Sequence, residues 1–270
     1  MGYVQLNGVN LFYELKGNVE SEDTVVFLNG VMASTSSWVY QVPVFEKMGF
    51  KILLHDFRGQ LKSDKPKGPY SFAQHAADTK ALMEHLGICK AHIIGTSYGG
   101  EVAMRFSIDY PENVKTVSII DSVSELDEVL KYFVKGWTIL AKEKDGERFF
   151  WGMVPTIYHD DFIKKNYEML KQRAEAMGKV PEDYFEGQVY LYETFEQDVY
   201  MTEELNKIQC PALVVCGEND ILKPSKFSKV IVDHIPNAEY AIIPNCGHVT
   251  IFEKPSILNS MLLGFVMKNL

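Results

Sequence analysis

The sequence lacks a basic cluster and any long uncharged apolar segment. Its 27 Lys and Arg residues stand against 36 Asp and Glu residues, which gives a formal net charge of -9. Without a run of cations to neutralise phosphates, a nucleic-acid partner is not expected. No stretch reaches the roughly 18 uncharged apolar residues that a membrane span needs, and the N-terminus shows no signal-peptide pattern. These absences predict a soluble, cytoplasmic protein that binds neither nucleic acid nor a membrane.

Cysteine is also scarce, and its spacing argues against a disulfide framework or a zinc site. The four cysteines, Cys89, Cys210, Cys216 and Cys246, form no CxxC pair and lie in or beside apolar segments. Scattered cysteines of this kind favour buried free thiols. The sequence therefore predicts no metal site.

Apolar residues, by contrast, are plentiful and suit one large core. The chain has 270 residues, of which 46% are hydrophobic, and a chain of this size can bury a single large core. Short runs that are apolar on both faces recur along it, as is typical of buried parallel strands. The predicted strands are Tyr3–Leu6, Phe12–Leu15, Thr24–Leu28, Lys51–His55, Ala91–Ile94, Thr116–Ile120, Ala212–Cys216 and Glu239–Ile243.

Helical patterns alternate with these strands. Apolar residues recur at steps of three and four between Phe72 and Leu86, and again between Ile257 and Phe265. The Asn7-Gly8 pair between the first two strands is a strong hairpin signal, so the sheet should begin antiparallel and continue parallel. We therefore expect an α/β protein with an eight-stranded, mostly parallel, doubly wound sheet.

The alternation of strands and helices stops between residues 121 and 201. Helix-like stretches dominate there, and the segment holds nearly half of the aromatic residues. We predict a core domain from residues 1–120 and 202–270, with a helical cap inserted at 121–201. The aromatic rings either form a small core of the cap or line an apolar substrate pocket. At least two are expected in the pocket, with Trp151, in the dense run "RFFWGMVP", as the leading candidate and Trp137 as the second.

The stretch "AHIIGTSYGG" carries the strongest signal for chemistry. Ser97 follows a predicted buried strand and precedes a helical pattern, with Gly95 and Gly99 on either side. At such a strand-to-helix turn, a GxSxG serine presents its hydroxyl at the carboxyl edge of the sheet. A dinucleotide-binding loop is disfavoured because it would need glycine where Ser97 stands. Ser97 is therefore predicted to be a nucleophile.

A serine hydroxyl needs a base to accept its proton, and the chain has 7 histidines. His248 follows the last predicted strand, in "PNCGHVTIFEKP", and its loop can reach back over the edge of the sheet. His55 ends a strand and is a weaker contender. The remaining histidines fall in strand, helix or insertion patterns: His75, His85, His92, His159 and His234.

The acid that would orient this base is predicted to be Asp220. It follows a predicted strand in "VVCGENDILKP", in the same kind of loop. Asp121, at the end of the preceding strand, and Glu218 remain alternatives. The chain order Ser97, Asp220, His248 is the one expected when the nucleophile elbow comes first.

With these segments in place, nearly the whole chain resembles the α/β-hydrolase fold family. The segments "GTSYGG", "GENDILKP" and "CGHVTIFEKP" are similar to its nucleophile, acid and base segments, and "HDFRGQLKSDKP" resembles its arginine-glycine loop. The resemblance implies an oxyanion hole built from the backbone N–H groups of Val31, in "FLNGVMAS", and Tyr98. It also places Asn29 and Met32 beside the substrate pocket.

Two residues depart from the family's usual pattern. Asn29 stands where the family commonly has histidine, which leaves the backbone donor intact but changes how the loop is braced or adds a polar group near the pocket. Leu61 stands where the family usually has glycine, so that turn must avoid a positive φ or accept strain.

The predicted chemistry is acyl transfer to water. Ser97 would attack an acyl carbonyl, His248 would take its proton, and Asp220 would orient the imidazole. We expect a serine hydrolase for an ester, thioester or lactone with a small to medium apolar acyl group, without a metal or organic cofactor. Alternatives on the same fold are C–C bond hydrolysis and cofactor-free perhydrolysis. An alternative of another class is a ligand-sensing signalling protein that retains the triad, and nothing indicates whether the chain pairs with itself.

Overall fold

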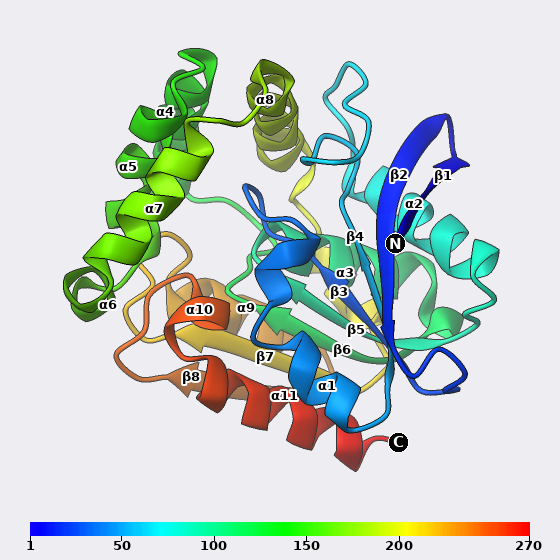
Figure 1. Cartoon of the computed structure of the whole chain (residues 1–270). Coiled ribbons are helices and arrows are strands. Elements are labelled where there is room, and N and C mark those ends of the chain that lie inside the picture. Colours follow the sequence, from blue (N-terminus) through cyan, green and yellow to red (C-terminus); the bar gives the residue numbers. More distant parts are fainter.

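The computed structural model describes residues 1–270 and contains one eight-stranded sheet with helices on both faces (Figure 1). The spatial order of the strands is β1-β2-β4-β3-β5-β6-β7-β8. β2 pairs antiparallel with β1 and with β4, and every other pairing is parallel. This confirms the predicted mostly parallel sheet. The strands are β1 Gly2–Leu6, β2 Val9–Gly17, β3 Thr24–Leu28, β4 Lys51–His55, β5 Ala91–Thr96, β6 Val114–Ile120, β7 Ala212–Gly217 and β8 Ala238–Ile243.

The first two strands are joined by the tight turn that the sequence predicts. Asn7 and Gly8 both have positive φ values, 47° and 75°, as a type I′ hairpin turn requires. The turn sets the register in which Leu6 lies opposite Val9. The antiparallel start of the sheet is therefore encoded locally.

Helices cover both faces of the sheet because its central strands are apolar on both sides. In β3, Val26 and Leu28 belong to one core cluster, whereas Val25 and Phe27 belong to the other. One face is covered by α1 and α11, and the opposite face by α2, α3 and α9 (Figure 1). These helices are α1 Val42–Lys47, α2 Phe72–His85, α3 Tyr98–Asp109, α9 Ser225–His234 and α11 Pro255–Lys268, and the short α10 spans Thr250–Glu253.

Five further helices occupy the segment between β6 and β7, at the top and left of Figure 1. They are α4 Glu128–Lys142, α5 Gly146–Ile157, α6 Asp160–Lys165, α7 Tyr167–Met177 and α8 Glu182–Asp198. Most of their buried rings do not form a separate core. Trp137, Phe185 and Tyr192 belong to the same cluster as Val26 in the centre of the sheet. Only a group of 5 buried residues around Phe150 and Tyr158 forms a cluster of its own.

The cysteines are less uniformly buried than the sequence suggests. All four are free; Cys216 and Cys246 are buried, but Cys210 is half-buried and Cys89 is exposed. Cys89 follows α2 at a surface turn, so an apolar neighbour in sequence does not bury it. No three or more His, Cys, Asp or Glu side chains gather as metal ligands would. None of the helices has the length and apolar character needed to cross a bilayer.

Candidate active site

Ser97 lies at the sharp turn between β5 and α3. Its φ of 52° and ψ of -121° fall in a region that non-glycine residues rarely occupy, so the turn is strained. A Cβ on Gly95 would lie 2.1 Å from the Gly99 carbonyl oxygen, and one on Gly99 would lie 2.0 Å from the Leu28 carbonyl oxygen. Only glycine fits at these two positions. The strained turn thus brings the serine hydroxyl to the carboxyl edge of the sheet.

His248 reaches this hydroxyl from the loop after β8. Its Nε2 lies 3.0 Å from Ser97 Oγ, although the two residues are 151 positions apart. The backbone N–H of His248 donates to the carbonyl of Ile157, at the end of α5, at 2.9 Å. The loop that holds the imidazole is therefore anchored to the helices between β6 and β7.

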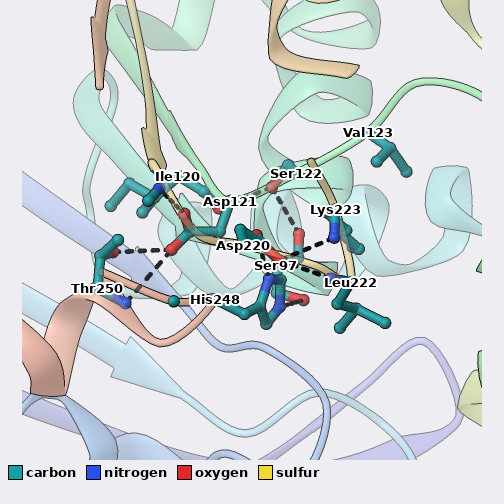
Figure 2. Close-up of polar contacts among 12 residues, drawn as sticks. Ser97, Ile120, Asp121, Ser122, Val123, Asp220, Leu222, Lys223, His248 and Thr250 are labelled. Atoms are coloured by element: carbon teal, nitrogen blue, oxygen red, sulfur yellow. Dashed lines mark hydrogen bonds and ion pairs between the residues drawn. The ribbon is translucent and has the colours of Figure 1, made fainter. Parts of the chain in front are cut away.

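Asp220, in the loop after β7, meets the other nitrogen of the imidazole, and Figure 2 shows it beside Ser97 and His248. Its Oδ2 is 2.7 Å from Nδ1 of His248. Its other oxygen accepts from the backbone N–H groups of Leu222 and Lys223 at 2.9 and 2.8 Å. These two bonds fix the carboxylate, so it holds the ring with Nε2 directed at Ser97.

The surroundings of His248 favour its protonated form. Complete burial opposes a charge on the imidazole, but the carboxylate of Asp220 outweighs this, and the pKa of His248 is raised above its ordinary value. Asp121 adds to the increase, and the ammonium of Lys223 opposes it. The ring is thus suited to accept a proton and to carry the resulting charge.

Neither of the alternative acids forms a hydrogen bond with the imidazole. One oxygen of Asp121 accepts from the Gly217 N–H at 3.0 Å, and the other accepts from the Thr250 hydroxyl at 2.8 Å (Figure 2). Burial raises the pKa of Asp121. Glu218 accepts from the backbone N–H of Asn245 at 3.0 Å. Asp220 is therefore the carboxylate that is bonded to His248.

His55 is also removed from the serine. Its Nε2 lies 3.1 Å from the Thr79 hydroxyl, and burial lowers its pKa to about 4. It is a neutral core residue, and His248 is the histidine that meets Ser97.

Two backbone N–H groups beside Ser97 have no acceptor within the protein. They belong to Val31, in the loop after β3, and to Tyr98, the first residue of α3. Both residues line one small void together with Ser97. The next N–H along the loop, that of Met32, donates to Oε1 of Gln188 in α8 at 3.0 Å. The two unpaired donors can therefore receive an oxygen that gains negative charge.

Asn29 does not line the pocket, contrary to the expectation from sequence. It is fully buried, and its amide donates to the His55 carbonyl at 2.8 Å and to the Gln60 side chain at 3.1 Å. Its oxygen accepts from Trp38 Nε1 at 2.8 Å. These hydrogen bonds use both the donor and the acceptor of the Asn29 side chain. Asn29 therefore braces the loop that carries Val31 and does not face a substrate.

A cavity of about 420 Å³ opens from Ser97 and His248 toward the helices between β6 and β7. Met32 and Trp137 line it, as expected from the sequence. Leu61 lines it as well. Its φ is not positive, so its turn avoids the strain that a positive φ would cause. The other apolar lining residues include Phe150, Met153, Ile157, Tyr158, Val249, Ile251 and Phe252.

Trp151 is a second correction to the predicted pocket. It is absent from the cavity wall, and its ring stacks on Tyr167 with 6.0 Å between ring centroids. Phe150, its neighbour on α5, lines the cavity instead. Successive helix residues point in directions about 100° apart, so the dense aromatic run could not indicate which ring faces inward.

Comparison with known proteins shows the family to which the chain belongs. A sequence model of the family described as "alpha/beta hydrolase fold" matches residues 23–255. The chain belongs to the α/β-hydrolase fold family. The relatives of this α/β-hydrolase include MGS-M2, an alpha/beta hydrolase enzyme from a Medee basin deep-sea metagenome library. That structure aligns with a TM-score of 0.92 and 30% identity over 98% of this chain and 96% of its own.

Two further relatives of this α/β-hydrolase cover it almost completely. Est816, described as an N-acyl homoserine lactone degrading enzyme, has a TM-score of 0.81 and 27% identity over 97% of this chain and 99% of its own. The proline iminopeptidase of Lactobacillus acidophilus is 25% identical over 99% of this chain and 98% of its own length. The chain is therefore similar to these two enzymes over almost its full length.

Sequence reasoning missed three side chains that shape the site of this α/β-hydrolase. Lys223 forms an ion pair with Glu101 at 2.9 Å, buried behind Ser97 and Asp220. Gln188, on α8, accepts a hydrogen bond from the Met32 backbone N–H. Arg173, on α7, lines the cavity. Lys223 lies in the acid segment "GENDILKP", which could have drawn attention to it. The sequence around Gln188 and Arg173 contains no motif that indicates a role in the site.

Proposed function

We propose that this α/β-hydrolase is a serine hydrolase that cleaves a carboxylic ester, thioester or lactone with a small to medium apolar acyl group. The observation that carries the proposal is the row of hydrogen bonds from Asp220 through His248 to Ser97, at 2.7 and 3.0 Å. A hydroxyl, an imidazole and a buried carboxylate in this order form the arrangement that activates serine for acyl transfer.

Acylation begins with attack by Ser97 Oγ on the carbonyl carbon of the substrate. The hydroxyl proton passes to Nε2 of His248, and Asp220 stabilises the imidazolium that forms. The imidazolium then donates this proton to the leaving oxygen or sulfur as its bond to the acyl carbon breaks. An acyl group remains on Ser97. Water, deprotonated by the same imidazole, then attacks the acyl carbon. The imidazolium returns this proton to Ser97 Oγ as the bond between Oγ and the acyl carbon breaks, which releases the carboxylic acid.

The developing oxyanion would be held by the backbone N–H groups of Val31 and Tyr98. Neither donates to a protein acceptor, and both lie beside Ser97. Tyr98 also begins α3, so the positive end of the helix dipole favours negative charge at the same place. Donors of this kind each contribute on the order of 10²- to 10³-fold to the rate.

The composition of the cavity wall favours a substrate that is recognised mainly through an apolar acyl group. Of its 24 lining residues, 16 are hydrophobic, and apolar walls with few polar groups are typical of small-molecule sites. Among the relatives, MGS-M2 is a hydrolase by name, Est816 is described as degrading an N-acyl homoserine lactone, and the third is a proline iminopeptidase. Their names support hydrolysis as the reaction class.

The decisive experiment compares the wild type with Ser97→Ala in hydrolysis of 4-nitrophenyl esters from acetyl to octanoyl, together with simple lactones. Ser97→Ala should lose ester hydrolysis while keeping its fold, and a fluorophosphonate should label the wild type on the peptide that contains Ser97. Ser107→Ala is the matched control, because this serine lies on α3 and bonds only to the Ala103 carbonyl at 2.8 Å. Substantial hydrolysis by purified Ser97→Ala would refute the proposal.

The same assays separate the remaining reactions. Labelling without ester or lactone turnover would favour C–C bond hydrolysis, and faster acyl release with hydrogen peroxide than with water would favour perhydrolysis. A single turnover that leaves a stable acyl-enzyme and changes the binding of a partner would favour a signalling role.

A further inference from the structure

Arg173 is the one arginine in this chain without a carboxylate partner. The chain has four arginines, and the other three form ion pairs at 2.5 to 3.2 Å: Arg58 with Asp78, Arg105 with Asp109 and Arg148 with Glu143. Arg173, on α7, makes no ion pair. A guanidinium presents a planar array of N–H donors that matches a carboxylate, so an unpaired one in a binding cavity is a candidate anion site.

The position of Arg173 is fixed within the wall of the active-site cavity. It lines the same cavity as Ser97 and His248. Its Nη1 donates to the hydroxyl of Tyr158 at 2.8 Å, and its guanidinium carbon lies 4.1 Å from the centre of the Phe252 ring. These contacts use one N–H and one face of the guanidinium, so its other donors remain available to a ligand.

No negative group in the cavity wall neutralises this charge. The chain has 36 acidic residues, yet none of the 24 residues that line the cavity is Asp or Glu. Burial raises the pKa of Tyr158, which therefore stays a neutral phenol. Glu253, the acid that interacts with Tyr158, instead accepts from the backbone N–H groups of Gly247 and His159. The cavity thus contains an uncompensated positive charge.

We propose that Arg173 binds a carboxylate of the substrate, so that the preferred substrate is an ester or lactone that also carries a free carboxylate. This inference rests on the proposed function and narrows its substrate class. The carboxylate either ends the acyl chain, as in a monoester of a dicarboxylic acid, or belongs to the leaving alcohol. In both cases the apolar wall contacts the hydrocarbon between the reacting carbonyl and the anion.

The test uses substrate pairs that differ only in charge. For the acyl side, 4-nitrophenyl monoesters of succinate, glutarate and adipate are compared with their neutral ω-carboxamides. For the alcohol side, butyryl esters of 4-hydroxybenzoate and of 4-hydroxybenzamide are compared. We expect wild-type kcat/KM to favour the carboxylate in one of the two series. Arg173→Met should reduce the ratio of carboxylate to carboxamide kcat/KM by about 10- to 100-fold, the usual effect of losing a charge-assisted hydrogen bond.

Two further variants separate charge from packing. Arg173→Lys keeps the charge without the planar donor array and should retain part of the preference. Arg148→Met is the matched control, because Arg148 lies on the surface of α5 and pairs with Glu143 at 3.2 Å; its ratio should equal that of the wild type. Equal rates for carboxylate and carboxamide in both series, or a preference that persists in Arg173→Met, would overturn the inference.

A binding measurement separates failure of this inference from failure of the proposed function. Glutarate, adipate and 4-hydroxybenzoate are titrated into Ser97→Ala by calorimetry, and into Ser97→Ala/Arg173→Met. Binding that depends on Arg173 would support the anion site even if no ester is hydrolysed. Ester hydrolysis without charge preference, together with no Arg173-dependent binding, would leave the serine hydrolase proposal standing and refute the anion site.

Discussion

Gln188 accepts a hydrogen bond from the backbone N–H of Met32 at 3.0 Å, across 156 positions of sequence. Met32 has a φ of 58°, a conformation that is unfavourable for a residue with a side chain. The bond therefore ties α8 to a strained loop. Because Val31 is the preceding residue in that loop, Gln188 also constrains the N–H group proposed to bind the oxyanion.

Gln188→Leu should weaken catalysis by releasing this loop. A displacement of about 1 Å in a reacting group can reduce a rate on the order of 100-fold, so we expect kcat to fall about 10- to 100-fold with a smaller change in KM. Fluorophosphonate labelling should slow in parallel. Gln172→Leu, at an exposed position on α7, is the control. Unchanged kcat in a folded Gln188→Leu protein would contradict the bracing role.

The buried pair of Lys223 and Glu101 should stabilise the loop that carries Asp220. The two side chains are 5% and 0% exposed, and Lys223→Met would leave Glu101 as an unpaired buried charge. We expect a loss of about 3 to 5 kcal/mol in the free energy of unfolding, measured with urea. The double variant Lys223→Met/Glu101→Gln should recover much of it.

The surface pair of Lys226 and Asp127 provides the comparison for that measurement. Lys226 is 61% exposed, so Lys226→Met should change the free energy of unfolding by less than about 1 kcal/mol. If Lys223→Met were no more destabilising than Lys226→Met, the buried pair would have no stabilising role.

The pH dependence of kcat/KM should report His248. Only the neutral imidazole can accept the serine proton, and Asp220 raises the pKa of His248. The rate should therefore rise with pH through a limb at or above about 6.5, the ordinary histidine pKa. Asp220→Asn removes the carboxylate, so the effect of burial dominates and the pKa of His248 should fall. The rise in kcat/KM should therefore move to lower pH, and its plateau value should fall by up to about 10⁴-fold. A pH-independent wild-type rate between pH 5 and 9, with chemistry limiting, would exclude His248 as the base.

Asp121→Asn should be much milder than Asp220→Asn. Asp121 bonds to Gly217 and Thr250 and not to the imidazole, and asparagine tolerates its positive φ of 49°. Loss of its charge should lower the pKa of His248 slightly, because Asp121 contributes to the rise. We expect kcat/KM within about tenfold of the wild type, since the base keeps its partner. Losses as large as those of Asp220→Asn would reopen the choice of acid.

Trp137 and Trp151 should differ in their effect on acyl-chain length. Trp137→Leu enlarges the cavity and breaks no hydrogen bond, since Trp137 Nε1 has no partner. We expect the optimum to shift toward longer acyl chains, with relative kcat/KM values changing about 10- to 200-fold. Trp151→Leu, outside the cavity, should leave the acetyl-to-octanoyl profile unchanged. The opposite result would place Trp151 in the substrate path.

The fold could be predicted because its signals are local. Apolar runs such as Thr24–Leu28 match β3 without a shift, since a strand buried on both faces needs an unbroken run. Asn7-Gly8 specifies its own turn. The same holds for Ser97, whose flanking glycines are required by backbone contacts within the elbow itself. The loops that hold Asp220 and His248 could be recognised because each follows a predicted strand, β7 and β8, at the carboxyl edge of the sheet.

The tertiary structure alone decided which side chains face the cavity. Trp151 turns away while its neighbour Phe150 faces inward, because the rotation of α5 depends on its packing against α4 and α7. Gln188 and Arg173 approach the site from distant helices, and no local pattern encodes such contacts. The sequence by itself thus determined the sheet and the turns that present Ser97, Asp220 and His248, because backbone geometry and burial act between neighbouring residues. The shape and charge of the cavity arise only when separate helices pack over the sheet, so only the folded chain decided them.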